Sequence, residues 1–221
     1  MIVLTKIPFW WPSDKPWMID DYKNIVKDIP DKSIDLILTD PPYGVGLDYG
    51  ETYEDSEENW YGLMSEFLPE AKRISNMIIM PCCRIKDLDW FYENFPPQWL
   101  ISWYKGSPGH VSYIGFNDWE PLLVYGKNEG IQMHDHFYCQ PNTDPNNNHP
   151  CPKPVGWAEW LIKRATEKRD IVFDPFLGSG TTLKACRNTD RIGLGCEINP
   201  EYESIIEKRS LNNVKRIDDY D

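Results

Sequence analysis

The segment Thr39-Asp40-Pro41-Pro42-Tyr43 combines a carboxylate, two prolines and an aromatic ring, directly after an apolar run of strand length. Neither proline has a backbone N–H, so the segment presents mainly carboxylate and carbonyl acceptors. Such acceptors suit the exocyclic amine of a nucleobase, because accepting its hydrogens localises the nitrogen lone pair and supports the positive charge of attack. The tyrosine ring offers a surface for base stacking. The alternative interpretation is an ordinary turn, in which Asp and Pro are common.

A second segment, Asp174 to Thr182, places a glycine loop between a predicted strand and a predicted helix. Gly178 and Gly180 would let the backbone approach a ligand closely, beside the free N–H groups of the helix. The lysine of a phosphate-binding loop is missing, and Leu183 takes the place of a third glycine. Glu197 ends the next predicted strand, 17 residues after Gly180, where a carboxylate can hold two ribose hydroxyls. These features predict a nucleoside ligand without an obligatory phosphate, which S-adenosylmethionine fits.

These residues must be positioned by strands and helices that alternate along the chain. Apolar runs of strand length occur at 17–19, 34–39, 77–80, 119–125, 171–173 and 191–196, and helical patterns at 22–29, 59–75, 157–165, 181–187 and 199–211. This alternation predicts an α/β fold built from parallel βαβ units. Asp21 (or Asp20), Asp40 and Glu197 each follow an apolar run. We expect them at the carboxyl edge of the sheet, where ligands bind in such folds.

The stretch from about residue 84 to 150 has a different composition, rich in Trp, Tyr, Pro, Gly and Asn. We expect it to form loops and an inserted recognition segment over a sheet edge, within one domain that spans residues 1–221. Residues 1–16 contain three prolines and predict an irregular arm.

A third segment, His149-Pro150-Cys151-Pro152-Lys153-Pro154, would by itself be a proline-rich loop. Together, the three segments resemble the motifs of the DNA amino-methyltransferases: an Asp-Pro-Pro-Tyr catalytic loop, a His-Pro-x-x-Lys-Pro segment and a Phe-x-Gly-x-Gly cofactor loop. They occur at 40–43, 149–154 and 176–180, in the order of the permuted beta class. The resemblance covers roughly residues 17–83 and 149–211.

The resemblance implies a Rossmann-like, mostly parallel sheet of the S-adenosylmethionine-dependent methyltransferase type. The residues that bind and activate the target amine would be Asp40, Pro41, Pro42 and Tyr43. The cofactor would be bound by Asp21, Lys153, Asp174, Phe176, Gly178, Gly180, Thr181 and Glu197. Among these, Glu197 would hold the ribose, Asp21 the adenine amino group (with Asp20 a weaker candidate), and Asp174 would lie near the amino-acid end.

The implied reaction is methyl transfer from S-adenosylmethionine to the exocyclic amine of a base flipped out of double-stranded DNA. The family's Asp-Pro-Pro-Tyr form leans toward adenine N6, so we favour adenine over cytosine N4. Other substrates with similar amines are RNA and a glutamine side chain, and an inactive nucleic-acid-binding partner subunit is a further alternative. A nucleotide-dependent oxidoreductase is disfavoured, because the third glycine is missing. Candidates for DNA-facing residues are Trp103, Lys105, Trp119 and Tyr125, although aromatic residues at such positions more often belong to the core.

The net charge of −12 is unusual for a protein that binds DNA, since such proteins normally neutralise phosphates with Lys and Arg. The charges are unevenly spread: residues 48–58 carry six acids and no base, whereas 153–191 carry eight bases and five acids. We interpret the acidic run as a solvated loop and expect a locally positive DNA-facing surface elsewhere. A homodimer or an accessory subunit would help so acidic a chain to cover a duplex.

Features of membrane, secreted or metal-binding proteins are weak. No run approaches the roughly 18 apolar residues of a membrane helix, and the first residues do not resemble a signal peptide. We therefore expect a cytoplasmic protein without membrane association. The six cysteines form no CxxC pair, and although Cys139 and Cys151 flank His149, we expect no metal.

Overall fold

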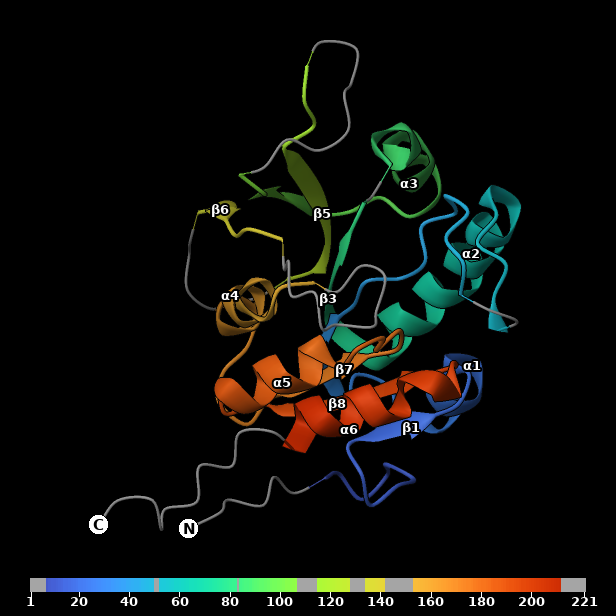
Figure 1. Ribbon diagram of the computed structural model, residues 1–221, viewed down its shortest axis with the longest axis vertical. Helices are drawn as coiled ribbons and strands as arrows, with labels where there is room; N and C mark the ends of the chain where they lie inside the picture. The colour runs from blue at the N-terminus through green and yellow to red at the C-terminus, as the bar shows by residue number, and fades with distance from the viewer. Residues whose placement is uncertain are drawn as a thin grey trace.

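The computed structural model describes residues 7–49, 52–82, 84–106, 115–127, 134–141 and 153–211. One eight-stranded sheet organises them, in the order β1-β8-β7-β2-β3-β5-β4-β6 (Figure 1). The strands are β1 (Trp17–Ile19), β2 (Ile34–Leu38), β3 (Ser75–Pro81), β4 (Trp99–Tyr104), β5 (Trp119–Gly126), β6 (His136–Tyr138), β7 (Ile171–Asp174) and β8 (Ile192–Glu197). Only β5 runs antiparallel to its neighbours among the described strands, which confirms the predicted, mostly parallel sheet.

Helices cover both faces of the sheet. They are α1 (Tyr22–Ile25), α2 (Glu57–Ile74), α3 (Leu88–Asn94), α4 (Val155–Ala165), α5 (Thr181–Asn188) and α6 (Glu203–Leu211), with short 3-10 helices η1 (Val26–Asp28), η3 (Ile85–Asp87) and η4 (Pro200–Tyr202). The helices predicted from periodicity are confirmed. In residues 7–16, the described part of the N-terminal arm, there is no helix or strand, as expected.

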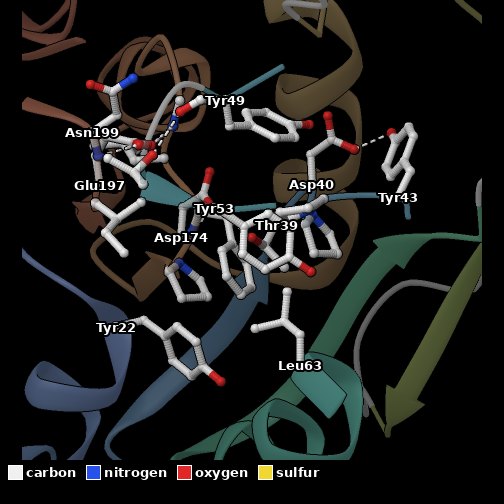
Figure 2. Close-up of a pocket in the computed structure, with 18 of the residues that line it drawn as sticks. Tyr22, Thr39, Asp40, Tyr43, Tyr49, Tyr53, Leu63, Asp174, Glu197 and Asn199 are labelled. Carbon is white, nitrogen blue, oxygen red and sulfur yellow. Dashed lines mark hydrogen bonds between the residues drawn. The ribbon is translucent and has the colours of Figure 1, made fainter. Parts of the chain in front are cut away.

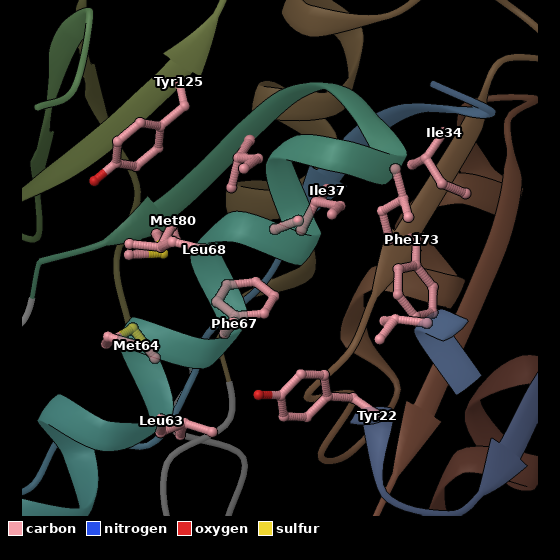
Figure 3. Close-up of a cluster of buried hydrophobic side chains, with 14 of the residues drawn as sticks. Tyr22, Ile34, Ile37, Leu63, Met64, Phe67, Leu68, Met80, Tyr125 and Phe173 are labelled. Carbon is pink, nitrogen blue, oxygen red and sulfur yellow. The ribbon is translucent and has the colours of Figure 1, made fainter. Parts of the chain in front are cut away.

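Strand β2 shows how the two layers are packed. Ile37 faces the layer of α1 and α2, whereas Leu36 and Leu38 face α4 and α5, as the alternation of a strand requires. Figure 3 shows Phe67 and Leu68 of α2 directed at this sheet face. Because β2 is buried on both sides, its residues are apolar on both faces, apart from the half-buried Asp35, which accepts the N–H of Ile171 in β7.

The structure differs in part from the expectation of loops between residues 84 and 150. The strand predicted at 119–125 is confirmed as β5, and β4 and β6, which were not predicted, also continue the central sheet; β4 pairs with β5 from Trp99↔Val124 to Tyr104↔Trp119. The Trp and Tyr residues that set the composition of this region apart are favoured on pleated, half-buried strands. Its role in target recognition stays a prediction.

Two of the residues expected to face DNA belong to the core instead. Trp103 and Tyr125 are buried, at 2% and 1% exposure, as the alternative of core residues predicted. Trp119 is exposed, and Lys105 forms an ion pair with Glu120 at 3.8 Å. No helix among the described residues is long and apolar enough to cross a membrane.

Asp174, the last residue of β7, ties three elements together beneath the carboxyl edge of the sheet. Its buried carboxylate accepts hydrogen bonds from the hydroxyl of Thr39 after β2 (2.7 Å), the hydroxyl of Thr182 in α5 (2.6 Å) and the N–H of Phe176 (3.1 Å). Burial raises the pKa of this carboxyl to about 6, although the three donors oppose the shift.

This raised pKa predicts a pH-dependent stability. The pKa of Asp174 is about 6 in the folded protein and 3.8 in the unfolded chain, so protonation of this carboxyl stabilises the folded state. The stabilisation is complete below about pH 3.8 and is lost as the pH rises through about 6. Asp174→Asn should remove it. The free energy of unfolding of the wild type, relative to the variant, should therefore fall by roughly 2–3 kcal/mol between about pH 4 and pH 7. Denaturant titrations at several pH values, with the exposed Asp28→Asn as control, measure this, and parallel pH profiles would contradict it.

Candidate active site

A cavity of about 690 Å³ lies at the carboxyl edge of the sheet. Most of the predicted site residues line it, namely Asp21, Asp40, Pro41, Pro42, Tyr43, Lys153, Asp174, Phe176, Gly178, Thr181 and Glu197. Gly180 is the exception: it precedes α5 with a φ of +80°, and a Cβ there would lie 3.4 Å from the backbone of Ile206. Figure 2 shows Asp40 and Tyr43 at one end of the cavity and Glu197 at the other, with Asp174 between them.

At the first end, three polar side chains meet. The Tyr43 hydroxyl donates a hydrogen bond to the Asp40 carboxylate (Figure 2). The Lys153 ammonium lies 3.1 Å from the other oxygen of Asp40 and also donates to the Tyr43 hydroxyl. It lies 5.0 Å from the centre of the Tyr43 ring as well. Lys153, assigned by the resemblance to the cofactor pocket, therefore reaches the Asp-Pro-Pro-Tyr segment and balances the charge of Asp40.

At the other end, Glu197 closes β8 against the glycine loop. Its two carboxylate oxygens accept the N–H groups of Gly178 (2.7 Å) and Asn199 (2.9 Å). Burial raises the pKa of Glu197, while these hydrogen bonds oppose the shift. Each carboxylate oxygen has a second lone pair, so Glu197 retains the capacity to accept hydroxyl groups from a ligand.

The two candidate acids after β1 are distinguished by their surroundings. Asp21 caps α1 by accepting the N–H of Lys23 at 3.0 Å, and it lines the cavity. Asp20 instead accepts the N–H of Asp21 at 2.7 Å and the side-chain amide of Asn24 at 2.9 Å. This geometry favours Asp21 as the residue that faces a ligand.

Arg209, a residue that sequence reasoning missed, stabilises the glycine loop through hydrogen bonds. Arg209 of α6 donates to the hydroxyls of Ser179 (2.6 Å) and Thr181 (2.9 Å). Thr181 in turn donates to the carbonyl of Lys153 at 3.1 Å, which connects the loop to the third motif. No local pattern indicates Arg209, because its partners lie about 30 residues away in the sequence.

The acidic run was interpreted as a solvated loop, and the structure contradicts this only in part. Its other described acids are exposed, but Asp55 is only 3% exposed, and Tyr49, Thr52 and Tyr53 of the same run line the cavity. The burial of Asp55 is possible because its carboxylate accepts the backbone N–H groups of Gly44, Val45 and Leu47. The sequence signal for this burial was the presence of tyrosines among the acids, because a fully solvated loop does not require aromatic side chains.

The cavity offers unsatisfied polar groups that a ligand could use. The hydroxyls of Tyr22 and Tyr53 are buried without a hydrogen-bond partner, and both residues line the cavity. Burial raises the pKa of Tyr53 to about 12 and that of Tyr22 further, so both hydroxyls remain protonated donors. Buried polar atoms are normally paired, so these orphans fit a polar ligand such as S-adenosylmethionine.

Among the described residues, no group of three or more His, Cys, Asp or Glu side chains could hold a metal ion. Of the candidate metal ligands Cys139, His149 and Cys151, the last two lie outside the described part of the chain, as do Pro150 and Pro152.

Comparison with known proteins points to DNA methyltransferases. A family model described as DNA methylase matches residues 103–208. The chain is 29% identical over 237 residues to the type II methyltransferase M.HpaI of Haemophilus parainfluenzae, and the match covers 89% of this chain and 74% of that protein.

Solved structures agree as well. The complex of M1.HpyAVI with S-adenosylmethionine is 25% identical, with a TM-score of 0.64 and coverage of 89% of this chain and 98% of that one. PvuII DNA methyltransferase (cytosine-N4-specific) is 17% identical with a TM-score of 0.70, covers 90% and 86% of the two chains, and supports the fold alone. The chain is therefore similar to the N6/N4 DNA methyltransferases, which use S-adenosylmethionine as the methyl donor.

Proposed function

We propose that this chain methylates the N6 amine of adenine in double-stranded DNA, and that Asp40, Pro41, Pro42 and Tyr43 hold the flipped base. The observation that carries the proposal is a single cavity that joins this acceptor-rich segment to the glycine loop and Glu197. A methyl donor at one end and an amine at the other would thus share a space of about 690 Å³, which suits two such ligands.

The acceptors act on the amine. The amine would donate one hydrogen bond to the Asp40 carboxylate and one to the Pro41 carbonyl, so that its lone pair is directed at the methyl group. When bound, S-adenosylmethionine supplies an electrophilic methyl group on a positively charged sulfur. The nitrogen that accepts this methyl group becomes positively charged as the bond between the methyl group and sulfur breaks, and the nitrogen then loses one proton to water. Asp40 stabilises this charge, and no covalent intermediate with the protein is needed.

Lys153 gives this mechanism a further requirement. Its ammonium lies 3.1 Å from Asp40, at the position from which a substrate amine would also donate. The amine must displace the ammonium or use the second lone pair of the same oxygen. Because Lys153 also donates to the Tyr43 hydroxyl, it holds the edge of the ring on whose face the base would stack.

The remaining cofactor contacts follow from the geometry of the other end. Glu197 would accept the ribose hydroxyls, and the Asp21 carboxylate would accept the adenine amino group. Asp174 would act mainly through Thr39 and Thr182, since its oxygens already accept three hydrogen bonds. Phe176, Gly178 and Thr181 would surround the amino-acid part.

DNA would meet the protein beside the ends of β4 and β5, where Trp119 is exposed. The net charge of −12 opposes binding to a polyanion. A homodimer would cover more of the duplex, whereas an accessory subunit would add positive surface.

The Asp40→Ala variant tests the catalytic assignment. Methyl transfer to unmethylated duplex DNA, measured by mass spectrometry of the digested nucleosides, should fall at least about 100-fold because the main acceptor is gone. The dissociation constant of S-adenosylmethionine, measured by calorimetry, should stay within about threefold of the wild type. Asp40→Asn keeps the side-chain volume, and Asp28→Ala is the surface control. Substantial activity of Asp40→Ala would sink the assignment.

The Glu197→Gln variant tests the cofactor assignment. Loss of the charge should weaken hydrogen bonds to the ribose and raise the dissociation constant of S-adenosylmethionine about tenfold or more. The rate at saturating cofactor should change only a few-fold, because Glu197 is remote from the reacting atoms. The exposed Glu201→Gln serves as the matched control. An unchanged dissociation constant would remove Glu197 from the binding site.

A further inference from the structure

The backbone that follows the Asp-Pro-Pro-Tyr segment is organised by one buried carboxylate. Asp55 accepts the N–H of Gly44 at 2.6 Å through one oxygen, and those of Val45 (3.1 Å) and Leu47 (3.0 Å) through the other. The N–H of Gly46 completes the set by donating to the Asp55 backbone carbonyl at 2.9 Å. Four consecutive backbone donors therefore end on a single residue.

The glycines make this arrangement possible. Gly44 and Gly46 have φ values of +65° and +80°, and alternating backbone handedness directs successive N–H groups toward one side, as in an anion-binding nest. The space around Gly44 is also restricted, because a Cβ there would lie 2.8 Å from the Cβ of Trp60. The nest is built for a carboxylate, and Asp55 provides it from the same chain.

The opposite side of Gly44 is fixed as well. Arg84 donates to the Gly44 carbonyl at 3.0 Å. Arg84 is itself held by an ion pair with the buried Asp87 and lies 4.8 Å from the Trp60 ring centre. The glycine directly after Tyr43 is thus clamped between Asp55 and Arg84.

From this geometry we infer that Asp55 is a positioning residue for methyl transfer, acting through the backbone of residues 44–47 on the Tyr43 ring. Asp55 itself is not among the described residues that line the cavity. Tyr53 and Glu54, the two residues that precede it, do line the cavity, so Asp55 also holds that wall in place. The inference rests on the proposed function, because it concerns the base-stacking ring.

The first test is independent of activity. Amide hydrogen exchange of residues 44–47 reports the nest directly, since an amide that is bonded to a buried carboxylate exchanges slowly. Asp55→Asn leaves one acceptor oxygen and places an NH₂ group against N–H donors, so exchange at these amides should accelerate about tenfold or more. Asp28→Asn is the matched control. Unchanged protection in Asp55→Asn would overturn the inference.

The second test is the transfer rate. Asp55→Asn should lower kcat for duplex DNA about tenfold, with the dissociation constant of S-adenosylmethionine within about threefold of the wild type. In the double variant, Asp55→Asn should lower kcat less than about twofold below the kcat of Tyr43→Ala alone, since both substitutions act on the same ring. Multiplicative effects of the two substitutions, or a kcat equal to that of the wild type, would contradict the positioning role.

The two tests separate the inference from the function on which it rests. A wild-type chain that transfers no methyl group to DNA would refute the proposed function, and the exchange measurement would then decide the role of Asp55 in the loop. Faster exchange together with unchanged transfer would refute the inference alone.

Discussion

The site depends on one buried carboxylate that accepts hydrogen bonds from both halves of the cavity. Asp174 receives the hydroxyl of Thr39, which precedes Asp40, and the hydroxyl of Thr182, which lies in the helix after the glycine loop. A buried acid is stable there only because its acceptors are occupied. The base-binding segment and the cofactor loop are far apart in sequence, and this interaction holds them at adjacent strand ends.

A second principle is that loops at the carboxyl edge are ordered by side chains rather than by regular structure. Glu197 joins β8 to the glycine loop, Arg209 joins that loop to α6, and Asp55 orders the backbone after Tyr43. Each contact pairs a charge with hydrogen-bond partners, so burial of the charge is compensated. The cavity is therefore largely preformed, which reduces the ordering needed when ligands bind.

Sequence reasoning recovered the parallel core because its signals are local. The apolar run at β2 and the Gly178–Gly180 loop each carry their own pattern, and parallel topology then brings their ends together. It failed where the signal is non-local. Trp103 was left open between a DNA-facing and a core position, because a strand pattern alone does not reveal which face is covered; in the structure Trp103, in β4, lies in the core. The burial of Asp55 and the role of Arg209 likewise depend on partners that only folding brings near.

The central claim is that a flipped adenine and the methyl donor meet in this one cavity. The most direct measurement incubates the purified wild-type chain with S-adenosylmethionine and unmethylated duplex DNA, and then identifies the modified nucleosides by mass spectrometry. The account predicts N6-methyladenine. N4-methylcytosine would contradict the choice of base while keeping the acceptor mechanism, and the absence of any methylated nucleoside, despite measured cofactor binding, would contradict the account as a whole.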